Sequence, residues 1–389
     1  MMFGEKFYTI FCRKAAQLIT IYKITNSTEK EKPLKTIDSI YSQLPDTLLP
    51  WYKQNARQLP WRQDTEPYHV WLSEIMLQQT RVEAVWTYYL RFLEQLPSIH
   101  ALSEAPESQL FKLWEGLGYY NRARNLQKAA HVIETQYGGR FPDQYEDIRA
   151  LPGIGPYTAG AIASICFNQP CAAVDGNVLR IITRMTENDA PIHRMQTKTE
   201  IAAQLEKVYP KENCGQFTQA LMELGATVCT PKSPKCTVCP ANSFCRAYAN
   251  GTVLQYPVKL PKKDKRVEDR TVFLLQCGDC YALTKRTENG LLSGLWQLPN
   301  ILGKLDVNEA LHSADAFGVQ PVELYKQMHR IHIFTHIKWQ MTCYHIRCTK
   351  KSSDFVWATE QEIQTTYALP TAFRMFFEFH HETDKTEDS

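Results

Sequence analysis

Apolar residues recur every three or four positions over roughly the first 250 residues, which is the spacing of one face of an α-helix. Ile40, Leu44, Leu48 and Tyr52 show the pattern near its start. It predicts helices over residues 39–58, 68–96 (as two helices), 107–117, 123–137, 145–151, 178–186, 197–208 and 215–228. Because no alternation of apolar and polar residues stands out in this region, we expect it to be all-α.

From Arg270 onward the apolar period changes to two, as in half-buried β-strands. Segments 271–276 and 281–286 flank a short turn at Gly278 and Asp279, which predicts a β-hairpin. We expect a helix over 307–317 and further strands near 322–329, 332–335 and 338–347. The fold class is therefore a mainly α N-terminal region followed by an α+β domain.

Shifts in composition mark the boundaries between these parts. We expect a poorly ordered N-terminal extension over 1–34, a helical domain over 35–252, a linker over 253–269, an α+β domain over 270–378 and an acidic tail over 379–389. The linker is polar and basic and contains two prolines, which disfavour regular structure.

Overall composition narrows the class of protein. Hydrophobic residues make up 44% of the chain and charged residues 22%, as in soluble globular proteins, and no apolar run reaches the roughly 18 residues of a membrane helix. The net charge is +3, so a nucleic-acid surface must be a local patch. The 12 cysteines, without an evident secretory signal, favour a metal site in a reducing compartment over disulfides.

Four of these cysteines are clustered at Cys229, Cys236, Cys239 and Cys245, in a segment that three prolines keep from forming a regular helix. Four thiolates can hold a tetrahedral zinc ion or a 4Fe–4S cluster. Zinc ribbons usually have two Cys-x2-Cys knuckles, whereas this segment has one. The wider outer spacings favour the iron–sulfur cluster.

A tight turn at residues 151–159 predicts two helices that meet at a phosphate-binding corner. Pro152 ends the first helix, and Pro156 suits the first position of the second. Gly153 and Gly155 permit positive φ and the close approach of another backbone. Free N–H groups at the positive end of the second helix would bind a phosphate. The alternative is an ordinary helical corner.

Two carboxylates are candidates for acid chemistry. Glu74 lies among Trp71, Ile75 and Met76, and poor solvation should raise its pKa so that it stays protonated near neutral pH. The alternative is an exposed glutamate on an amphipathic helix. Asp175 follows the glycine turn.

The remaining cysteines and several histidines carry weaker signals. We expect Cys166, Cys171, Cys214, Cys343 and Cys348 to be packing residues. Cys277 and Cys280 bracket the hairpin turn, and a second metal site with Cys343 and Cys348 stays open. His329, His332 and His336 alternate on expected strands and are candidates for a site. The alternative is that they simply lie on one solvent-exposed face of the sheet.

Together these motifs resemble those of the helix-hairpin-helix DNA glycosylases with an iron–sulfur loop. The four-cysteine spacing, residues 151–159 and Asp175 are marks of that superfamily. Segments 60–62, 71–82, 116–120, 174–178 and 220–230 resemble the branch that removes adenine mispaired with 8-oxoguanine. The resemblance covers about residues 38–376. It implies a helical subdomain over 62–166 and an iron–sulfur subdomain formed by 35–61 and 167–252.

The resemblance also implies catalytic roles. Glu74 would protonate N7 of an extruded adenine, and Asp175 would stabilise the positive sugar as the bond to N9 breaks. Tyr157 and Asn177 would support this region through hydrogen bonds. Endonuclease III-like relatives that cut the strand have a lysine nucleophile where this chain has Tyr157, so a Schiff base is not expected.

Further residues are implied to meet the DNA or a cofactor. The implied DNA contacts in the helical domain are Arg57, Trp61, Arg62, Gln78, Gln79, Thr80, Leu117, Tyr119, Gly153 and Gly155. The four clustered cysteines would hold the 4Fe–4S cluster. The implied partner is duplex DNA with adenine opposite 8-oxoguanine or guanine, bound by a monomer that is not attached to a membrane, in a bacterial-type cytoplasm and nucleoid.

The C-terminal domain resembles a Nudix fold, with residues 294–299 in the expected place. Its hydrolase helix should carry an Arg-Glu and Glu-Glu signature, but residues 307–317 contain only Glu309 and Asp315 as acids, so pyrophosphate hydrolysis is not expected. In the family this domain recognises 8-oxoguanine through a Phe-Ser-His loop. Here the loop is Phe334, Thr335 and His336, which keeps the hydroxyl and adds a methyl group.

Three other functions compete with this interpretation. A bifunctional thymine-glycol-type glycosylase is opposed by Tyr157 and by the extra domain. A non-catalytic DNA-binding scaffold would bind DNA but would not release adenine. A Nudix hydrolase with a helical partner would need magnesium-dependent nucleotide hydrolysis.

Overall fold

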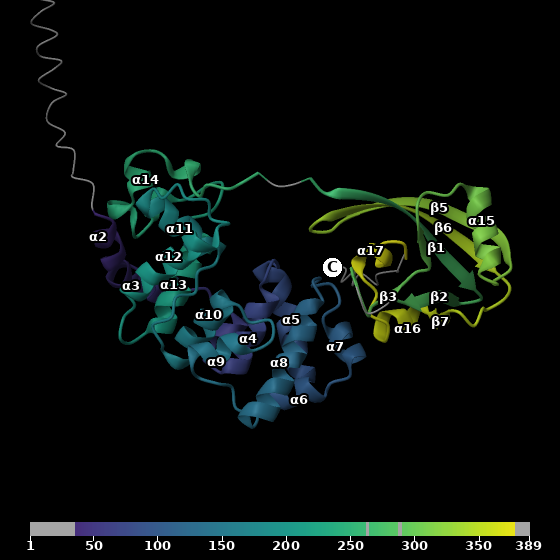
Figure 1. Cartoon of the computed structure of the whole chain (residues 1–389), viewed down its shortest axis with the longest axis horizontal. Coiled ribbons are helices and arrows are strands. Elements are labelled where there is room, and N and C mark those ends of the chain that lie inside the picture. The colour runs from purple at the N-terminus through teal and green to yellow at the C-terminus, as the bar shows by residue number, and fades with distance from the viewer. Residues whose placement is uncertain (1–35, 262–263, 287–289, 378–389) are drawn as a thin grey trace, which may run out of the picture.

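The computed structural model describes residues 36–261, 264–286 and 290–377, and the expected N-terminal extension and acidic tail lie outside these residues. Helices fill the left and lower parts of the view in Figure 1, and a sheet domain lies on the right. Both the all-α region and the α+β domain are therefore confirmed. None of the described helices is long and apolar enough to cross a membrane.

Residues 36–261 contain helices and no strand. The helices are α2 (Ile37–Ser42), α3 (Leu44–Asn55), α4 (Pro67–Met76), α5 (Val82–Gln95), α6 (Ile99–Glu104), α7 (Glu107–Leu113), α8 (Asn121–Tyr137), α9 (Tyr145–Ala150), α10 (Pro156–Phe167), α11 (Gly176–Thr186), α12 (Met195–Glu206), α13 (Cys214–Thr227) and α14 (Arg246–Ala249). Short 3-10 turns span Pro60–Arg62, Cys236–Val238, Asn242–Phe244 and Val253–Gln255.

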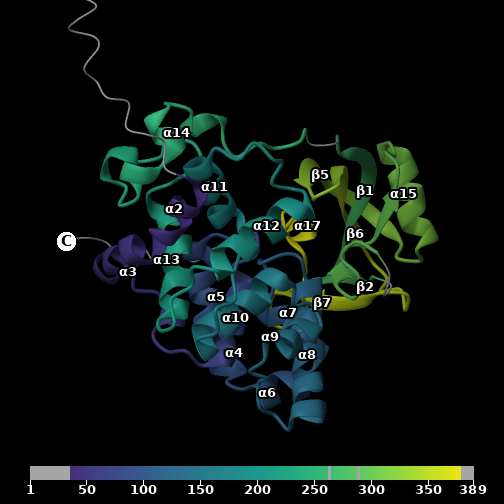
Figure 2. The same cartoon turned by 60° about the vertical axis from the view of Figure 1, so that its left-hand side comes forward.

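These helices enclose two apolar cores. The first gathers side chains from α4 to α10, with Trp71, Phe92 and Trp114 among its largest members. The second brings α2 and α3 against α11, α12 and α13, and the four-cysteine segment lies beside it. Figure 2 shows α2 and α3 next to α13, although a long stretch of chain separates them. The catalytic candidates come from both groups of helices, so their meeting depends on this packing.

The C-terminal domain is built on a mixed sheet. Its strands are β1 (Arg266–Cys277), β2 (Cys280–Lys285), β3 (Trp296–Gln297), β4 (Asn300–Leu302), β5 (Pro321–Ile333), β6 (Ile337–Cys348) and β7 (Val356–Thr359), and its helices are α15 (Val307–Ala316), α16 (Glu360–Thr365) and α17 (Thr371–Arg374). The main path is β3-β2-β1-β6-β5, in which β1 and β6 are parallel and the other neighbours are antiparallel.

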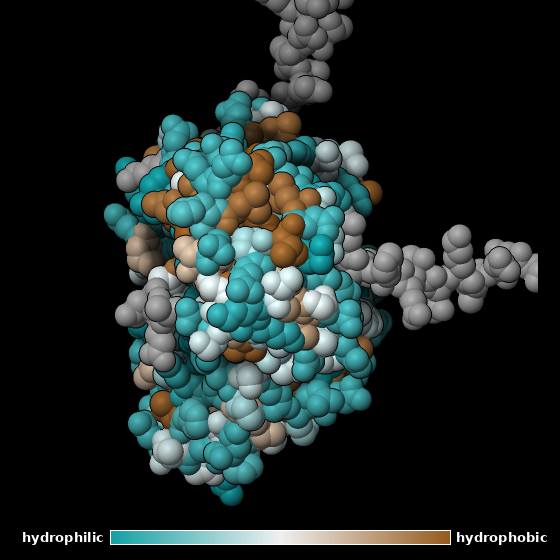
Figure 3. All heavy atoms as spheres, turned by 90° about the vertical axis from the view of Figure 1, so that its right-hand side faces the viewer, coloured by the Kyte–Doolittle hydropathy of each residue, from teal (hydrophilic) through white to brown (hydrophobic). Residues whose placement is uncertain are grey.

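Each face of this sheet has its own apolar core. Ala310 and Ala314 of α15 pack on Phe273 and Tyr344, while Phe373 of α17 packs on the opposite face. Such two-sided cover is expected for strands that are apolar on both faces. The side of the molecule formed by this domain is mostly hydrophilic, with one apolar area in its upper part (Figure 3).

Several expectations were wrong in detail. Strand β1 begins at Arg266, inside the expected linker, because residues 266–269 pair with β6. Strand β5 runs unbroken to Ile333, whereas we expected two strands near 322–329 and 332–335. Residues 334–336 instead join β5 to β6. The short elements β3, β4, β7, α6, α16 and α17 were not predicted, since they contain too few residues to show a period.

Candidate active site and nucleic-acid interface

The glycine turn between α9 and α10 forms as expected at one of its two glycines. Gly153 has φ of +78°, and a Cβ there would lie 2.5 Å from the Cβ of Asn125, so a side chain does not fit. Gly155 has extended backbone with φ of −94°, so of the two glycines that permit positive φ only Gly153 adopts it. Pro156 begins α10, which leaves the first N–H groups of this helix available to an anion.

One cavity of about 360 Å³ brings most of the candidate residues together. Its walls include Glu74, Tyr157, Asp175 and Asn177, together with Arg57, Trp61, Arg62, Gln78, Gln79 and Thr80. They come from α4, α10 and α11 and from the segments that precede α4 and follow it. The volume lies within the range of small-molecule pockets. The two candidate acids therefore line the same space.

Glu74 is buried on α4, with 6% of its surface exposed. The hydroxyl of Tyr157 donates a hydrogen bond to its carboxylate. Burial raises the pKa of Glu74 to about 7, the Tyr157 hydrogen bond lowers it in part, and the nearby charge of Asp175 raises it further. The poor solvation expected from its neighbours is present, so this side chain can carry a proton near neutral pH.

Asp175 has many more hydrogen-bond donors than Glu74. As the N-cap of α11, it accepts from the backbone N–H groups of Asn177 and Val178 at 2.8 and 2.7 Å, and from the Asn177 amide at 2.7 Å. Burial raises its pKa, but these hydrogen bonds and the charge of Arg180 oppose that rise. These donors favour the charged form of Asp175 more than the single Tyr157 donor favours that of Glu74.

Two functional candidates were missed from the sequence. Glu223 is fully buried on α13 and pairs with Arg57 at 2.6 Å and with Arg62 at 2.9 Å. Burial would raise the pKa of Glu223, but these arginines hold it below its ordinary value. Arg180 donates to the Asn177 side-chain oxygen at 2.8 Å and so orients the amide beside Asp175. A charged residue inside an apolar helical pattern, the signal that marked Glu74, also marks Glu223.

A second cavity of about 650 Å³ lies between the helical region and the C-terminal domain. Gln78, Gln79, Tyr119 and Gly153 line one side, and Phe334, Thr335 and His336 line the other. The hydroxyl groups of Tyr119 and Thr335 share a hydrogen bond of 3.0 Å across it. Tyr119 and Gln79 both have positive φ, which is uncommon outside glycine and is often found at functional sites.

Leu117 does not lie where we expected it. Only 6% of its surface is exposed, and it belongs to the first apolar core rather than to the wall of either cavity. The turn that follows α7 places Tyr119 outward and Leu117 inward. The two residues therefore differ in their access to a ligand, although the sequence assigns them to the same motif.

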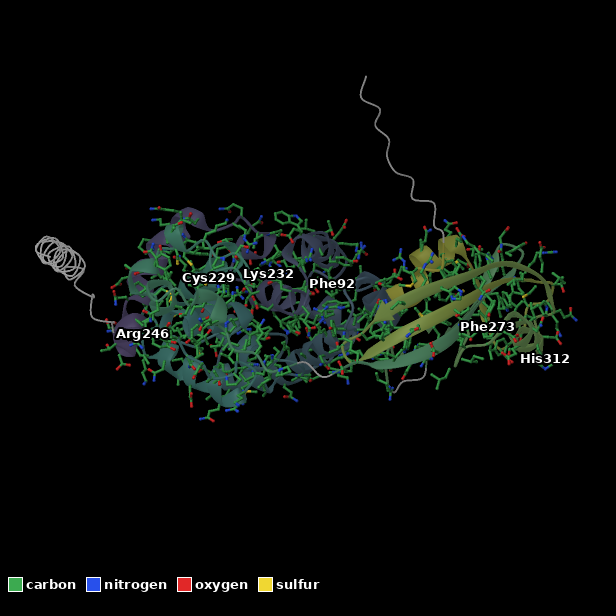
Figure 4. The ribbon with its side chains drawn as sticks, turned by 90° about the horizontal axis from the view of Figure 1, so that it is seen from above. Phe92, Cys229, Lys232, Arg246, Phe273 and His312 are labelled. Atoms are coloured by element: carbon green, nitrogen blue, oxygen red, sulfur yellow. The ribbon has the colours of Figure 1, made fainter. Side chains whose placement is uncertain are left out.

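The four clustered cysteines line one small cavity. Figure 4 places Cys229 in the helical part of the molecule, away from Phe273 and His312 of the C-terminal domain. Arg184 donates to the Cys229 sulfur at 3.3 Å. Within the described residues, no three cysteine, histidine or acidic side chains have the geometry to hold one metal ion. A cubic cluster takes each thiolate on a different iron, whereas a zinc ion takes all four at one point, so four cysteines around one cavity could serve either group.

Within the C-terminal domain, the cysteines and histidines with weaker sequence signals lie in different places. Cys343 lies in the core under α17 and Cys348 in the core under α15, on opposite faces of the sheet, and Cys277 packs against the core of Cys348. The four cysteines of the second metal site therefore do not meet at one point. His329 bonds to Thr342, whereas His332 packs on Phe334 and lines the second cavity. The alternative of one wet histidine face was therefore wrong for His329 and His332, because positions three apart on a strand face opposite sides.

Comparisons with known proteins match each half of the chain to a known family. Residues 72–211 match the HhH-GPD superfamily of base excision DNA repair proteins, and residues 271–378 match the NUDIX domain. The adenine DNA glycosylase of Buchnera aphidicola subsp. Baizongia pistaciae is 38% identical over 266 residues, which cover 67% of this chain and 74% of that protein.

Two further matches differ in extent. The adenine DNA glycosylase of Arabidopsis thaliana is 38% identical over 349 residues, which cover 75% of this chain. The matched part spans only 55% of the length of that plant protein. Among solved structures, a thermostable thymine-DNA glycosylase matches 55% of this chain and 98% of its own length, with 28% identity and a TM-score of 0.50.

Proposed function

Because this chain belongs to the adenine DNA glycosylase family of base excision repair proteins, we propose that it removes adenine paired with 8-oxoguanine or guanine in duplex DNA. The observation that carries the proposal is the single cavity that holds Glu74 and Asp175. Glu74 is suited to give a proton, and the hydrogen-bond donors around Asp175 favour its charged form. The reaction is hydrolysis of the N-glycosidic bond, with adenine as the leaving group.

The chemistry follows from these two acids. Glu74 transfers its proton to N7 of an adenine swung into the cavity, which makes the base a better leaving group. As the bond between C1′ and N9 breaks, positive charge develops on the sugar, and the Asp175 carboxylate stabilises it. Water adds its hydroxyl to C1′, and its remaining proton restores the acid. Tyr157 orients Glu74, and Asn177 orients Asp175.

Contacts with DNA would surround this cavity. Trp61, Arg62 and Gln78 lie in its wall, where they would contact the extruded nucleotide. The glycine turn and the N-terminus of α10 would hold a backbone phosphate. Gln79, Thr80 and Tyr119 would contact the opposite strand, and Tyr119 is exposed enough to wedge between bases. A single chain supplies all of these groups, so we propose that it acts on DNA as a monomer. The similarity to a bacterial adenine DNA glycosylase supports action in a bacterial-type cytoplasm and nucleoid.

The second cavity would hold the base opposite the adenine. Thr335 and His336 of the C-terminal domain are hydrogen-bonding side chains that line this cavity together with Tyr119, which supports a role in reading the opposite base. Nucleotide hydrolysis by this domain has no comparable support. Glu309, the main acid of α15, caps its own helix by accepting from the backbone N–H of Asp306.

The four clustered cysteines would hold a 4Fe–4S cluster that keeps their loop folded beside α11. Arg184 would fix the loop, since its guanidinium donates to Thr230 and Pro231 carbonyls as well as to Cys229. We expect purified protein to contain iron and acid-labile sulfide in equal amounts with the absorbance of a cluster. Zinc in their place would contradict this assignment.

Product analysis tests the proposed reaction. A duplex with adenine opposite 8-oxoguanine should yield free adenine and an abasic strand that stays intact until alkali cleaves it. Tyr157 offers no amine, so borohydride should trap no covalent adduct at this position. A trapped adduct with strand cleavage would instead favour the bifunctional glycosylase, and DNA binding without release of adenine would favour the scaffold.

A further inference from the structure

We propose that Glu115 is a positioning residue for recognition of the damaged base. It locks the C-terminal domain onto the helical domain, so that Thr335 and Tyr119 face each other across the second cavity. This inference rests on the proposed function. It goes further by assigning part of the preference for 8-oxoguanine to a buried docking contact that touches neither base of the pair.

Glu115 is a buried carboxylate shared by both domains. It follows α7 and exposes 8% of its surface. One oxygen accepts the backbone N–H of Leu369 at 2.8 Å, and the other pairs with Lys112 at 2.7 Å and Arg374 at 3.3 Å. Leu369 and Arg374 belong to the C-terminal domain. A single side chain of the helical domain thus binds two groups of its neighbour.

Lys112 extends the same contact. Its ammonium group donates to the carbonyls of Ile363 and Tyr367, at 3.0 and 3.3 Å, at the end of α16. Burial lowers the pKa of Lys112, and the hydrogen bond from its ammonium to Glu115 opposes this. Removing the carboxylate would deprive the largely buried Lys112 ammonium of its ion-pair partner Glu115, which is costly inside a protein. Docking should therefore loosen when Glu115 is lost.

An apolar contact accompanies the charged one. Leu295 and Ala368 of the C-terminal domain are 0% and 4% exposed and belong to the first core of the helical domain. Next to Leu295, the backbone at Gly294 lies so close to Arg124 that a Cβ would be 2.3 Å from its guanidinium. Domains usually move relative to each other unless their interface is well packed. Here the packing is that of a shared core.

The loop that bears Tyr119 connects this interface to the second cavity. Arg122 fixes the loop to the end of α4 by donating to the carbonyls of Leu117 and Gly118 and to that of Gln78. Tyr119 lies four residues after Glu115 in the same turn. Tyr119 is thereby held to the helical domain, while Glu115 holds the domain that carries Thr335. The 3.0 Å contact between Tyr119 and Thr335 depends on both attachments.

The two cavities respond differently to this interface. Helical-domain residues alone line the cavity of Glu74 and Asp175, whereas both domains line the second cavity. Loss of docking should therefore impair the distinction between 8-oxoguanine and guanine and leave the excision chemistry in place. A defect in folding would lower the rate with both duplexes.

A double-mutant cycle tests the proposal. Single-turnover rate constants for adenine release are measured with 8-oxoguanine:adenine and guanine:adenine duplexes, for the wild type, Glu115→Ala, Thr335→Ala and the double variant. We expect Glu115→Ala to lower the ratio of the two rate constants on the order of tenfold, with the guanine:adenine rate retained. Thr335→Ala should lower the ratio further only in the wild-type background, because both variants disturb one contact.

Other outcomes overturn the proposal or the function beneath it. Additive losses in the double variant, an unchanged ratio, or an equal fall with both duplexes would show that Glu115 does not act through Thr335. No adenine release by the wild type from either duplex would instead refute the proposed function.

Matched variants distinguish the proposed positioning role of Glu115 from a folding defect. Glu115→Gln keeps an acceptor for Leu369 N–H and should lose less of the ratio than Glu115→Ala. Arg374→Met removes only the more exposed partner of the carboxylate and should shift the ratio in the same direction if Glu115→Ala does not fold. Glu146→Ala removes an exposed pair with Arg149 on α9 and should leave the ratio unchanged. An unchanged ratio in folded Arg374→Met and Glu115→Gln would also overturn the proposal.

Discussion

Glu74→Gln should lower the single-turnover rate of adenine release by a factor of about 10²–10⁴, the usual worth of general-acid catalysis. The amide has the same shape and can still accept the hydrogen bond from Tyr157, but it has no acidic proton for N7 of adenine. The buried setting that raises the pKa of Glu74 to about 7 would no longer have a group to titrate. Binding of the duplex, measured by fluorescence anisotropy, should be retained.

The matched control for this variant is Glu66→Gln. Glu66 is an exposed residue that precedes α4, the helix that carries Glu74, and it lines neither cavity. Its rate should equal that of the wild type. If Glu74→Gln released adenine within threefold of the wild-type rate, the role of Glu74 as proton donor would be refuted.

Asp175→Asn should lower the same rate by about 10²–10³, because the variant lacks the fixed anion that faces the developing sugar cation. Asparagine is also a good N-cap, so α11 should keep its first turn and the fold should remain stable. The expected result is therefore a slow enzyme with a melting temperature close to that of the wild type.

A second substitution at this position separates charge from capping. Asp175→Ala removes both the charge and the acceptor of the Asn177 and Val178 N–H groups, so it should also melt earlier. Loss of activity only in Asp175→Ala, with Asp175→Asn active, would mean that Asp175 is a structural cap and not a catalytic anion.

Local patterns in the sequence were sufficient to predict much of the candidate site. Apolar neighbours within one turn of helix predicted the burial of Glu74, and two prolines with Gly153 predicted the turn before α10. The spacing of the four cysteines placed them in one loop, and they do line one cavity. In each case the residues that decide the structure are close together in the chain.

Contacts between distant residues were not predictable in the same way. Glu223 meets Arg57 and Arg62 across 166 and 161 positions of sequence, and no local period encodes that pairing. The docking of Glu115 on Leu369 is of the same kind. The backbone conformation of Gly155 could not be predicted either, because a glycine permits positive φ without requiring it.

Strand boundaries failed for a related reason. Residues 266–269 read as part of a polar linker, yet they are strand because β6 lies alongside to pair with them. Pairing partners decide the extent of a strand more than its own composition does. The loop of Thr335 was consequently assigned to a strand, although it lies between β5 and β6.

The pH dependence of adenine release by the wild type tests the central claim most directly. Single-turnover rates are measured on an 8-oxoguanine:adenine duplex from pH 5.5 to 9, a range of roughly three and a half pH units that spans the raised pKa of Glu74. The protonated carboxyl is the active form, so the rate should be highest below its pKa of about 7 and fall as the pH rises through that value. A rate that rises through that value, or no release of adenine at any pH, would contradict the account.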